Sequence, residues 1–158
     1  MTNYRVLFLC FMLLLFGSAS CQDEFMKIEC AVSPRQVLQG NEGLLKIKIN
    51  VRNGIRISAN PEFLIRLDEN ESLSFAKIFF AGSELNLPTT QEKEGVFLDP
   101  QKEIEVPFKL NEGALIGNLT VSGEVIFTML FQDNWSVKTT QKFSANFVSR
   151  RNYKIKKK

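Results

Sequence analysis

This 158-residue chain contains no histidine, so its cysteine and carboxylate side chains are the first candidates for redox, acid-base or metal-binding chemistry. Histidine is the commonest general base and the commonest metal ligand, so a serine triad of the usual form is excluded. The acidic run Asp68–Glu71 lacks the spacing and the glycine of a calcium-binding loop and indicates a solvated turn. Glu103 and Glu105 fall on the polar side of an alternating segment. We therefore expect no catalytic residue, no metal site and no cofactor.

Cys30 is the cysteine to consider for a redox role, because it lies within the predicted domain. It alternates in phase with Met26, Ile28 and Val32, which predicts that it faces a core, where a free cysteine behaves as a small hydrophobic residue. A reactive thiol needs partial exposure and a positive neighbourhood. We interpret Cys30 as structural. The alternative is that Cys30, alone or with Cys21, exchanges with a thioredoxin-like partner.

Residues 1–20 have the organisation of a secretory signal peptide. Arg5 supplies the positive charge, Val6–Phe16 form an apolar run of 11 residues, and small residues precede Cys21. A membrane-spanning helix needs roughly 20 apolar residues, so this run is too short to be one. The pattern predicts an exported protein.

The residues before Cys21 allow two kinds of processing. The sequence Gly17-Ser18-Ala19-Ser20-Cys21 is similar to a bacterial lipobox, with Ser18 in place of the usual leucine. A lipid on Cys21 would anchor the mature protein to a membrane, in the periplasm or on the outer membrane or cell surface. Ordinary cleavage near Ala19 or Ser20 is the alternative, and only then is Cys21 free to pair with Cys30.

Charge is divided between an acidic body and a basic tail. Residues 21–149 contain 13 basic and 17 acidic side chains, whereas Arg150–Lys158 add six positive charges. Such a tail meets anionic lipid or an acidic partner, or is a solvated terminus, which is the interpretation we prefer. An exported chain with an acidic body is not expected to bind nucleic acid.

Apolar and polar residues alternate along almost all of the mature chain, and no window shows a helical period. Seven segments carry this pattern: Met26–Val32, Leu44–Val51, 62–68, Leu73–Phe80, Glu103–Leu110, Asn118–Phe131 and Trp135–Phe147. They predict an all-β, immunoglobulin-like two-sheet sandwich of about seven antiparallel strands over residues 24–148, followed by the tail at 149–158.

Two stretches interrupt this pattern. Ala81–Gln101 is unpatterned and is expected to be a long loop. Gln132–Asn134 is a short polar turn joining the last two segments into a hairpin. Trp135 follows this turn in phase with Val137, which favours packing as core or cap, with a binding aromatic as the alternative.

The segment Asn53–Pro61, "NGIRISANP", resembles a motif of the amino-terminal periplasmic domain of the thiol:disulfide interchange protein DsbD, the disulfide bond corrector domain. The matching residues are Gly54, Ile57, Ala59, Asn60 and Pro61, with Leu119, Gly123, Val125 and Phe127 in a later strand. The resemblance covers roughly residues 37–147. It implies that the segment is a kink by which the chain leaves one strand, crosses the end of the sandwich and joins the next, with turn-forming residues at both corners.

The chain departs from this family at the redox chemistry. Redox-active members carry a cysteine pair where this sequence reads "FTMLFQDNWSVK", so the thiol relay is not carried over. We expect a non-catalytic binding module with an unidentified envelope protein as partner. Its binding surface would include Asn53, Gly54, Asn60, Pro61, Asp133, Asn134 and Trp135, together with the loop at 81–101. The alternatives are an accessory protein of a thiol-disulfide or cytochrome-maturation pathway, and a surface lipoprotein contacting host or envelope components.

Overall fold

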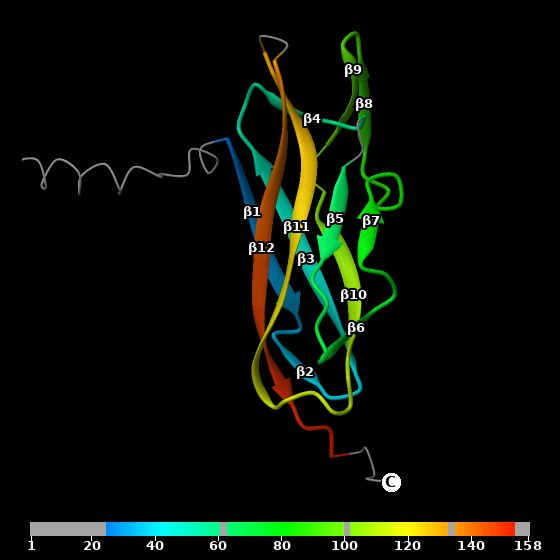
Figure 1. Ribbon diagram of the computed structural model, residues 1–158, viewed down its shortest axis with the longest axis vertical. Coiled ribbons are helices and arrows are strands. Elements are labelled where there is room, and N and C mark those ends of the chain that lie inside the picture. The colour runs from blue at the N-terminus through cyan, green and yellow to red at the C-terminus, as the bar shows by residue number, and fades with distance from the viewer. Residues whose placement is uncertain (1–24, 61–62, 100–101, 133–134, 154–158) are drawn as a thin grey trace, which may run out of the picture.

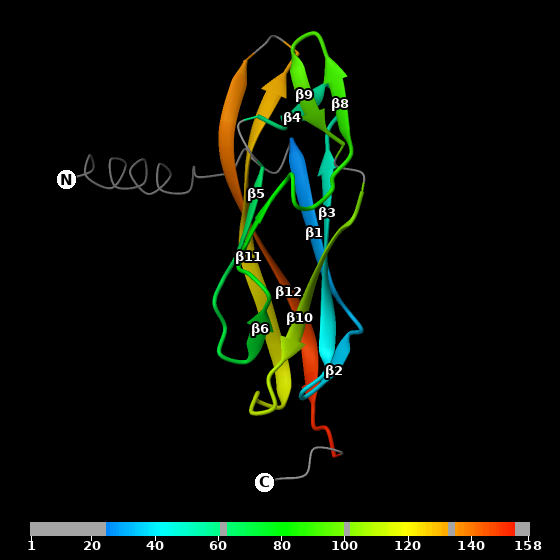
Figure 2. The same ribbon diagram turned by 90° about the vertical axis from the view of Figure 1, so that its right-hand side faces the viewer.

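The computed structural model describes residues 25–60, 63–99, 102–132 and 135–153, and these form a two-layered β structure (Figures 1 and 2). One sheet has four strands, in the order β1 (Met26–Ser33), β3 (Glu42–Val51), β10 (Ile104–Leu110) and β6 (Leu73–Phe75). The second has the order β2 (Gln36–Leu38), β12 (Ser136–Arg150), β11 (Gly117–Phe131), β4 (Ile55–Ser58), β9 (Gly95–Leu98) and β8 (Thr89–Glu92). In this second sheet β5 (Leu64–Leu67) also pairs with β11, and β7 (Phe79–Ala81) pairs with β5. No described helix could cross a membrane.

The core lies between the two sheets and follows from the alternation in the sequence. Leu45 and Ile47 of β3 and Val125 and Phe127 of β11 are almost completely buried, while their neighbours along each strand face outward. The strands pair antiparallel, except that β2 runs parallel to the end of β12. The prediction of an all-β, immunoglobulin-like two-sheet sandwich is confirmed.

The described part of the chain forms more strands than the seven segments predicted. Leu73–Phe80, expected to be one strand, is divided into β6 in the four-stranded sheet and β7 in the other. The stretch expected to be a long loop contains the β8–β9 hairpin. Every residue of β8 is exposed, so this strand buries no side chain and carries no apolar alternation for sequence analysis to detect.

The interrupted segment after β3 crosses from one sheet to the other, as Figure 1 shows. β3 belongs to the four-stranded sheet, and after the turn at Asn53–Gly54 the chain continues as β4 against β11. Ile57 lies opposite Met129, and Leu64 lies opposite Ile126. The segment from Ile57 to Leu64 is therefore four residues longer than the part of β11 that it faces. Because of this insertion β4 and β5 pair separately with β11, and each takes a different outer neighbour, β9 and β7.

Two details concern the ends of strands. β6 pairs with β10 only at residues 108–110, so Pro107, which lacks a backbone N–H, lies just beyond the end of β6. The domain was expected to end at residue 148, but β12 continues to Arg150. The Gln39 N–H donates to the Arg150 carbonyl oxygen at 2.9 Å, which holds the start of the basic tail against the sandwich.

Candidate functional site

One end of the sandwich, here called the hairpin end, is formed by Phe25, Gly54, Phe131, Gln132 and Trp135. The Trp135 ring lies 4.9 Å from the Phe131 ring, and Phe131 meets Phe25 edge to face at 5.5 Å between centroids. The Phe131 N–H donates to the Trp135 carbonyl oxygen at 2.9 Å. Trp135 therefore caps the aromatic row, yet 61% of its surface remains exposed.

The Asn53–Gly54 turn lies against this aromatic row. Gly54 has a φ of +86°, and a Cβ placed there would lie 2.8 Å from the side-chain nitrogen of Gln132. Glycine is the residue that adopts this conformation without strain and allows so close an approach. The structure thus brings Gly54 to the β11–β12 hairpin.

The remaining predicted site residues are placed differently. Asn60 follows the other end of β4, where its N–H donates to the Ser58 hydroxyl oxygen at 3.2 Å, and the neighbouring Ala59 N–H donates to Val96 of β9. Asn60 thus lies beside β9, whereas Gly54 lies at the hairpin end. The predicted residues Cys21, Pro61, Asp133 and Asn134 are outside the described residues.

A charged cluster fixes the β8–β9 hairpin to β4. The Arg56 guanidinium bonds to Glu92 and, at 2.7 Å, to Glu94, and it lies 4.5 Å above the centroid of the Phe97 ring. The hydrogen bond to Glu94 is the largest of the causes that raise the pKa of Arg56. Because the Arg56 guanidinium binds both carboxylates, we interpret the cluster as structural: it holds the β8–β9 hairpin against β4.

Cys30 faces the core, as the alternation of β1 predicted. It pairs with Ile47 across β1 and β3 and packs, partly buried, against the core. Burial raises the pKa of the Cys30 thiol to about 12. At neutral pH this thiol is therefore almost entirely protonated, and the protonated form is a poor nucleophile. No group of three or more metal-ligating side chains occurs among the residues that the structure describes.

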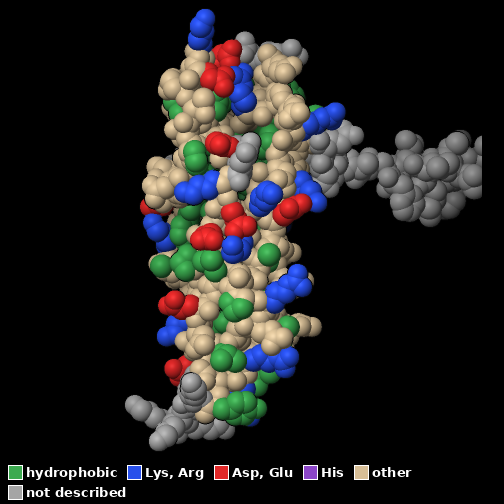
Figure 3. Space-filling view, turned by 180° about the vertical axis from the view of Figure 1, so that it is seen from behind, with side chains coloured by type: hydrophobic (Ala, Val, Ile, Leu, Met, Phe, Trp, Pro, Cys, Tyr) green, Lys and Arg blue, Asp and Glu red, His purple; other side chains and the backbone are tan. Residues whose placement is uncertain are grey.

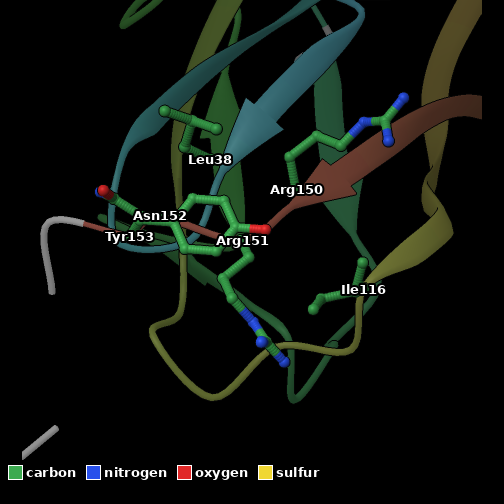
Figure 4. A pocket seen from close by; sticks show the side chains of 6 residues that line it. All are labelled: Leu38, Ile116, Arg150, Arg151, Asn152 and Tyr153. Carbon is green, nitrogen blue, oxygen red and sulfur yellow. The ribbon is translucent and has the colours of Figure 1, made fainter.

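The opposite end of the sandwich, here called the Arg150 end, carries a surface that the sequence analysis did not identify. A hollow of about 560 Å³ is lined by Leu38, Ile116, Arg150, Arg151, Asn152 and Tyr153. Figure 4 shows the Leu38, Ile116 and Tyr153 side chains around it, with the two arginine side chains pointing away in different directions. In the space-filling view, hydrophobic and basic side chains lie beside one another at this lower end (Figure 3).

The sequence held one signal for this surface. Leu115 and Ile116 are adjacent apolar residues between Gly113 and Gly117, outside any alternating segment. They lie in the loop before β11, where the alternation that turns every second residue of a strand inward does not apply. Here both are exposed, by 75% and 51%.

Comparison with known proteins yields structural neighbours only. No protein-family model matches the chain, and no curated protein matches it. Two crystal structures of BcpA, the major pilin subunit of Bacillus cereus, align with TM-scores of 0.44 and 0.41 at 9% and 7% sequence identity. These alignments cover 78% of this chain and 40% and 39% of the pilin chains. Murine CRIg aligns with a TM-score of 0.33 at 11% identity, over 79% of this chain and 98% of its own. The chain thus spans less than half the length of the pilin.

Proposed function

We propose that this protein is an exported, lipid-anchored, non-catalytic binding module of the bacterial envelope that recognises a partner protein through its hairpin end. The relation to the amino-terminal domain of the disulfide interchange protein is part of this proposal. This relation rests on two similarities to the family motifs: the segment around Gly54, and the strand that contains Gly123, where the backbone of β5 approaches β11 closely.

The observation that carries the proposal is the conformation of Trp135. Tryptophan is enriched among the residues that dominate binding energy at protein interfaces, because a large ring fixed in position loses little entropy on binding. Trp135 is held by the Phe131 ring and by a backbone hydrogen bond, and 61% of its surface is exposed. A partner would thus meet an aromatic anchor that is already ordered.

The position of the proposed lipid fits this arrangement. Cys21 precedes Phe25 by four residues, so the two Cα atoms lie within about 14 Å of each other. Phe25 packs on Phe131 at the hairpin end. A lipid on Cys21 would hold this end close to the membrane, and the partner would therefore be a membrane-proximal envelope protein.

Site-specific cross-linking tests the binding surface. A photoreactive phenylalanine analogue is placed at Trp135 in the otherwise unchanged full-length protein, and in a second protein at Thr140, an exposed position of β12, the strand that follows Trp135. We expect a discrete cross-linked product from position 135 in intact cells and none from position 140. Equal products, or none from either position, would contradict the proposal.

Cysteine replacement tests the anchor separately. Cys21→Ala should abolish palmitate labelling and release the protein into the soluble fraction. Cys30→Ala is the matched control, because Cys30 packs against the core in β1, and it should leave labelling and detergent partitioning unchanged. If Cys21→Ala behaves as the wild type does, ordinary signal cleavage is the correct interpretation.

The two alternative functions make different demands. An accessory protein of a thiol-disulfide pathway needs a thiol that reacts in the folded state, and the raised pKa of Cys30 argues against this one. A surface lipoprotein contacting host components would need its hairpin end to face outward from the cell. Cross-linking at Trp135 would then capture a partner only when host material is present.

A further inference from the structure

The Arg150 end exposes four apolar or aromatic side chains together. Leu38, Leu115, Ile116 and Tyr153 have exposed fractions of 41%, 75%, 51% and 87%. They come from β2, from the loop before β11 and from the residues after β12, so three separate parts of the chain contribute to one surface. Single exposed apolar residues are ordinary, whereas a group of them marks an interaction site.

This surface is ordered by hydrogen bonds that converge on Gln39. The Gln39 side-chain amide donates to the Ala114 carbonyl oxygen at 2.6 Å, next to Leu115. Its backbone N–H donates to the Arg150 carbonyl oxygen at 2.9 Å, and its own carbonyl oxygen accepts from the Asn152 side chain at 3.1 Å. The apolar loop and the C-terminal segment are therefore held side by side before any ligand arrives, which reduces the entropy lost on binding.

The charged side chains that line the hollow are both positive. They belong to Arg150 and Arg151. Acidic residues lie farther along the loop that carries Leu115: Glu112 is part of it, and the Glu71 carbonyl oxygen accepts from the Asn111 side chain at 2.8 Å. Arginine packs its aliphatic stem on apolar surface while its guanidinium reaches anionic groups. The occupant of this surface therefore combines negative charge with an apolar interior.

We propose that the Arg150 end binds the surface of an anionic lipid bilayer, with Leu115 and Ile116 entering the acyl region and the arginines at the headgroups. Basic residues near such a surface are attracted to anionic lipids, and apolar side chains gain free energy by leaving water. A nucleic acid or another soluble polyanion would engage the arginines but would leave the two aliphatic side chains in water. The exposed aliphatic pair therefore favours a bilayer.

This contact is separate from the proposed lipid anchor. β12 runs from the hairpin end to the Arg150 end, and its 15 residues span about 45 Å at the rise of an extended strand. The start of β1 and the C-terminal residues lie at different heights of the molecule in Figures 1 and 2. Bilayer binding by the Arg150 end can therefore be measured in protein that lacks the anchor.

The experiment uses residues 22–158, since every described strand lies between Met26 and Arg150. Co-sedimentation is measured with vesicles of phosphatidylcholine alone and with vesicles containing phosphatidylglycerol. We expect binding to the anionic vesicles only, and Leu115→Ser with Ile116→Ser should weaken it by about tenfold or more. Arg150→Glu with Arg151→Glu should weaken it similarly. The matched control, Lys138→Glu with Lys142→Glu, makes the same change in net charge on exposed positions of β12 and should bind as the wild type does.

A fluorescence measurement identifies the end that touches the bilayer. Trp135 is the single tryptophan of the chain and lies at the hairpin end, so its emission should not shift when anionic vesicles are added. In a protein carrying Trp135→Phe and Ile116→Trp, the emission should shift to the blue. Far-ultraviolet circular dichroism of each variant establishes that it is folded.

The proposal is overturned if the serine pair binds anionic vesicles as tightly as the wild type, or if Trp135 shifts instead of the residue at position 116. It is also overturned if the protein binds polyphosphate or RNA but not vesicles, with the serine pair unaffected, because the partner is then a soluble polyanion. Failure of cross-linking at Trp135 leaves the bilayer result standing, so the two proposals fail separately.

Discussion

Replacing Gly123 with alanine should destabilise the sandwich severely. Gly123 lies in the middle of β11, between Leu67 of β5 and Phe143 of β12. A Cβ at this position would lie 2.4 Å from the Arg66 carbonyl oxygen, 2.8 Å from Cζ of Phe143 and 3.1 Å from Cα of Leu67. Two of these atoms belong to the backbone of β5, so the contact is not relieved by a change of rotamer.

The expected cost follows from these contacts. Overpacking a core typically costs about 1–3 kcal/mol, and a clash with backbone belongs at the upper end of that range. Alanine also lowers the entropy of the unfolded chain, which returns about 0.4–1 kcal/mol. The free energy of unfolding should therefore fall by about 2 kcal/mol, a large share of the stability of a domain of this size.

Chemical denaturation of residues 22–158 measures this loss. Gly113→Ala is the matched control, because nothing lies within 4 Å of a Cβ there and its φ is outside the left-handed region. It should leave stability unchanged or raise it by about 0.5 kcal/mol. If Gly123→Ala cost no more than Gly113→Ala, the close approach of β5 to β11 would be wrong.

Three further outcomes are expected. Ser149 is fully buried, and its hydroxyl oxygen has no hydrogen-bond partner among the described residues. Ser149→Ala should therefore raise the free energy of unfolding by about 1 kcal/mol in the same denaturation experiment, and a loss of that size would show that the hydroxyl has a partner. Arg56→Ala should speed hydrogen exchange at Val96 and Phe97, because it removes the ion pairs and the ring contact between β4 and the β8–β9 hairpin, whereas Arg52→Ala should leave this exchange unchanged. Equal exchange in the two variants would mean that Arg56 does not hold the hairpin. Native Cys30 should react slowly with Ellman's reagent and quickly after denaturation. Because burial raises the pKa of Cys30 from 9.0 to about 12 in the folded protein, the unfolded chain loses this proton first, and the free energy of unfolding should fall as the pH rises above about 9. Cys30→Ala should remove this fall.

Alternation predicted the strands that bury one face. β1, β3, β10, β11 and β12 each place apolar residues inward at every second position, and the sequence located all five. The Asn53–Gly54 pair also indicated a turn, and Gly54 has a φ of +86°, which few residues other than glycine adopt. The crossing that follows this turn was an implication of the family resemblance. The strands and the turn depend on local chemistry, which a single sequence contains.

The features that were missed depend on tertiary contacts. β8 is held by β9 and by the Arg56 cluster, and it buries nothing that its own sequence could reveal. β6 and β7 separate because they pair with different sheets. The Arg150 end brings together three segments that are far apart in the sequence, and hydrogen bonds through Gln39 join them. The sequence alone did not show that Leu115–Ile116 lie near the start of the basic tail.

The exposure of Trp135 in the intact envelope, measured by hydroxyl-radical footprinting, tests the binding function most directly. Oxidation is compared between the purified protein and the same protein in native membranes, with Phe79 of β7 as an exposed aromatic reference outside both proposed contact surfaces. We expect Trp135 to be oxidised readily in the purified protein, because 61% of its surface is exposed, and to be protected by about fivefold or more in the envelope, where a partner covers it. Equal oxidation of Trp135 in both preparations would contradict the claim that the hairpin end is a binding surface.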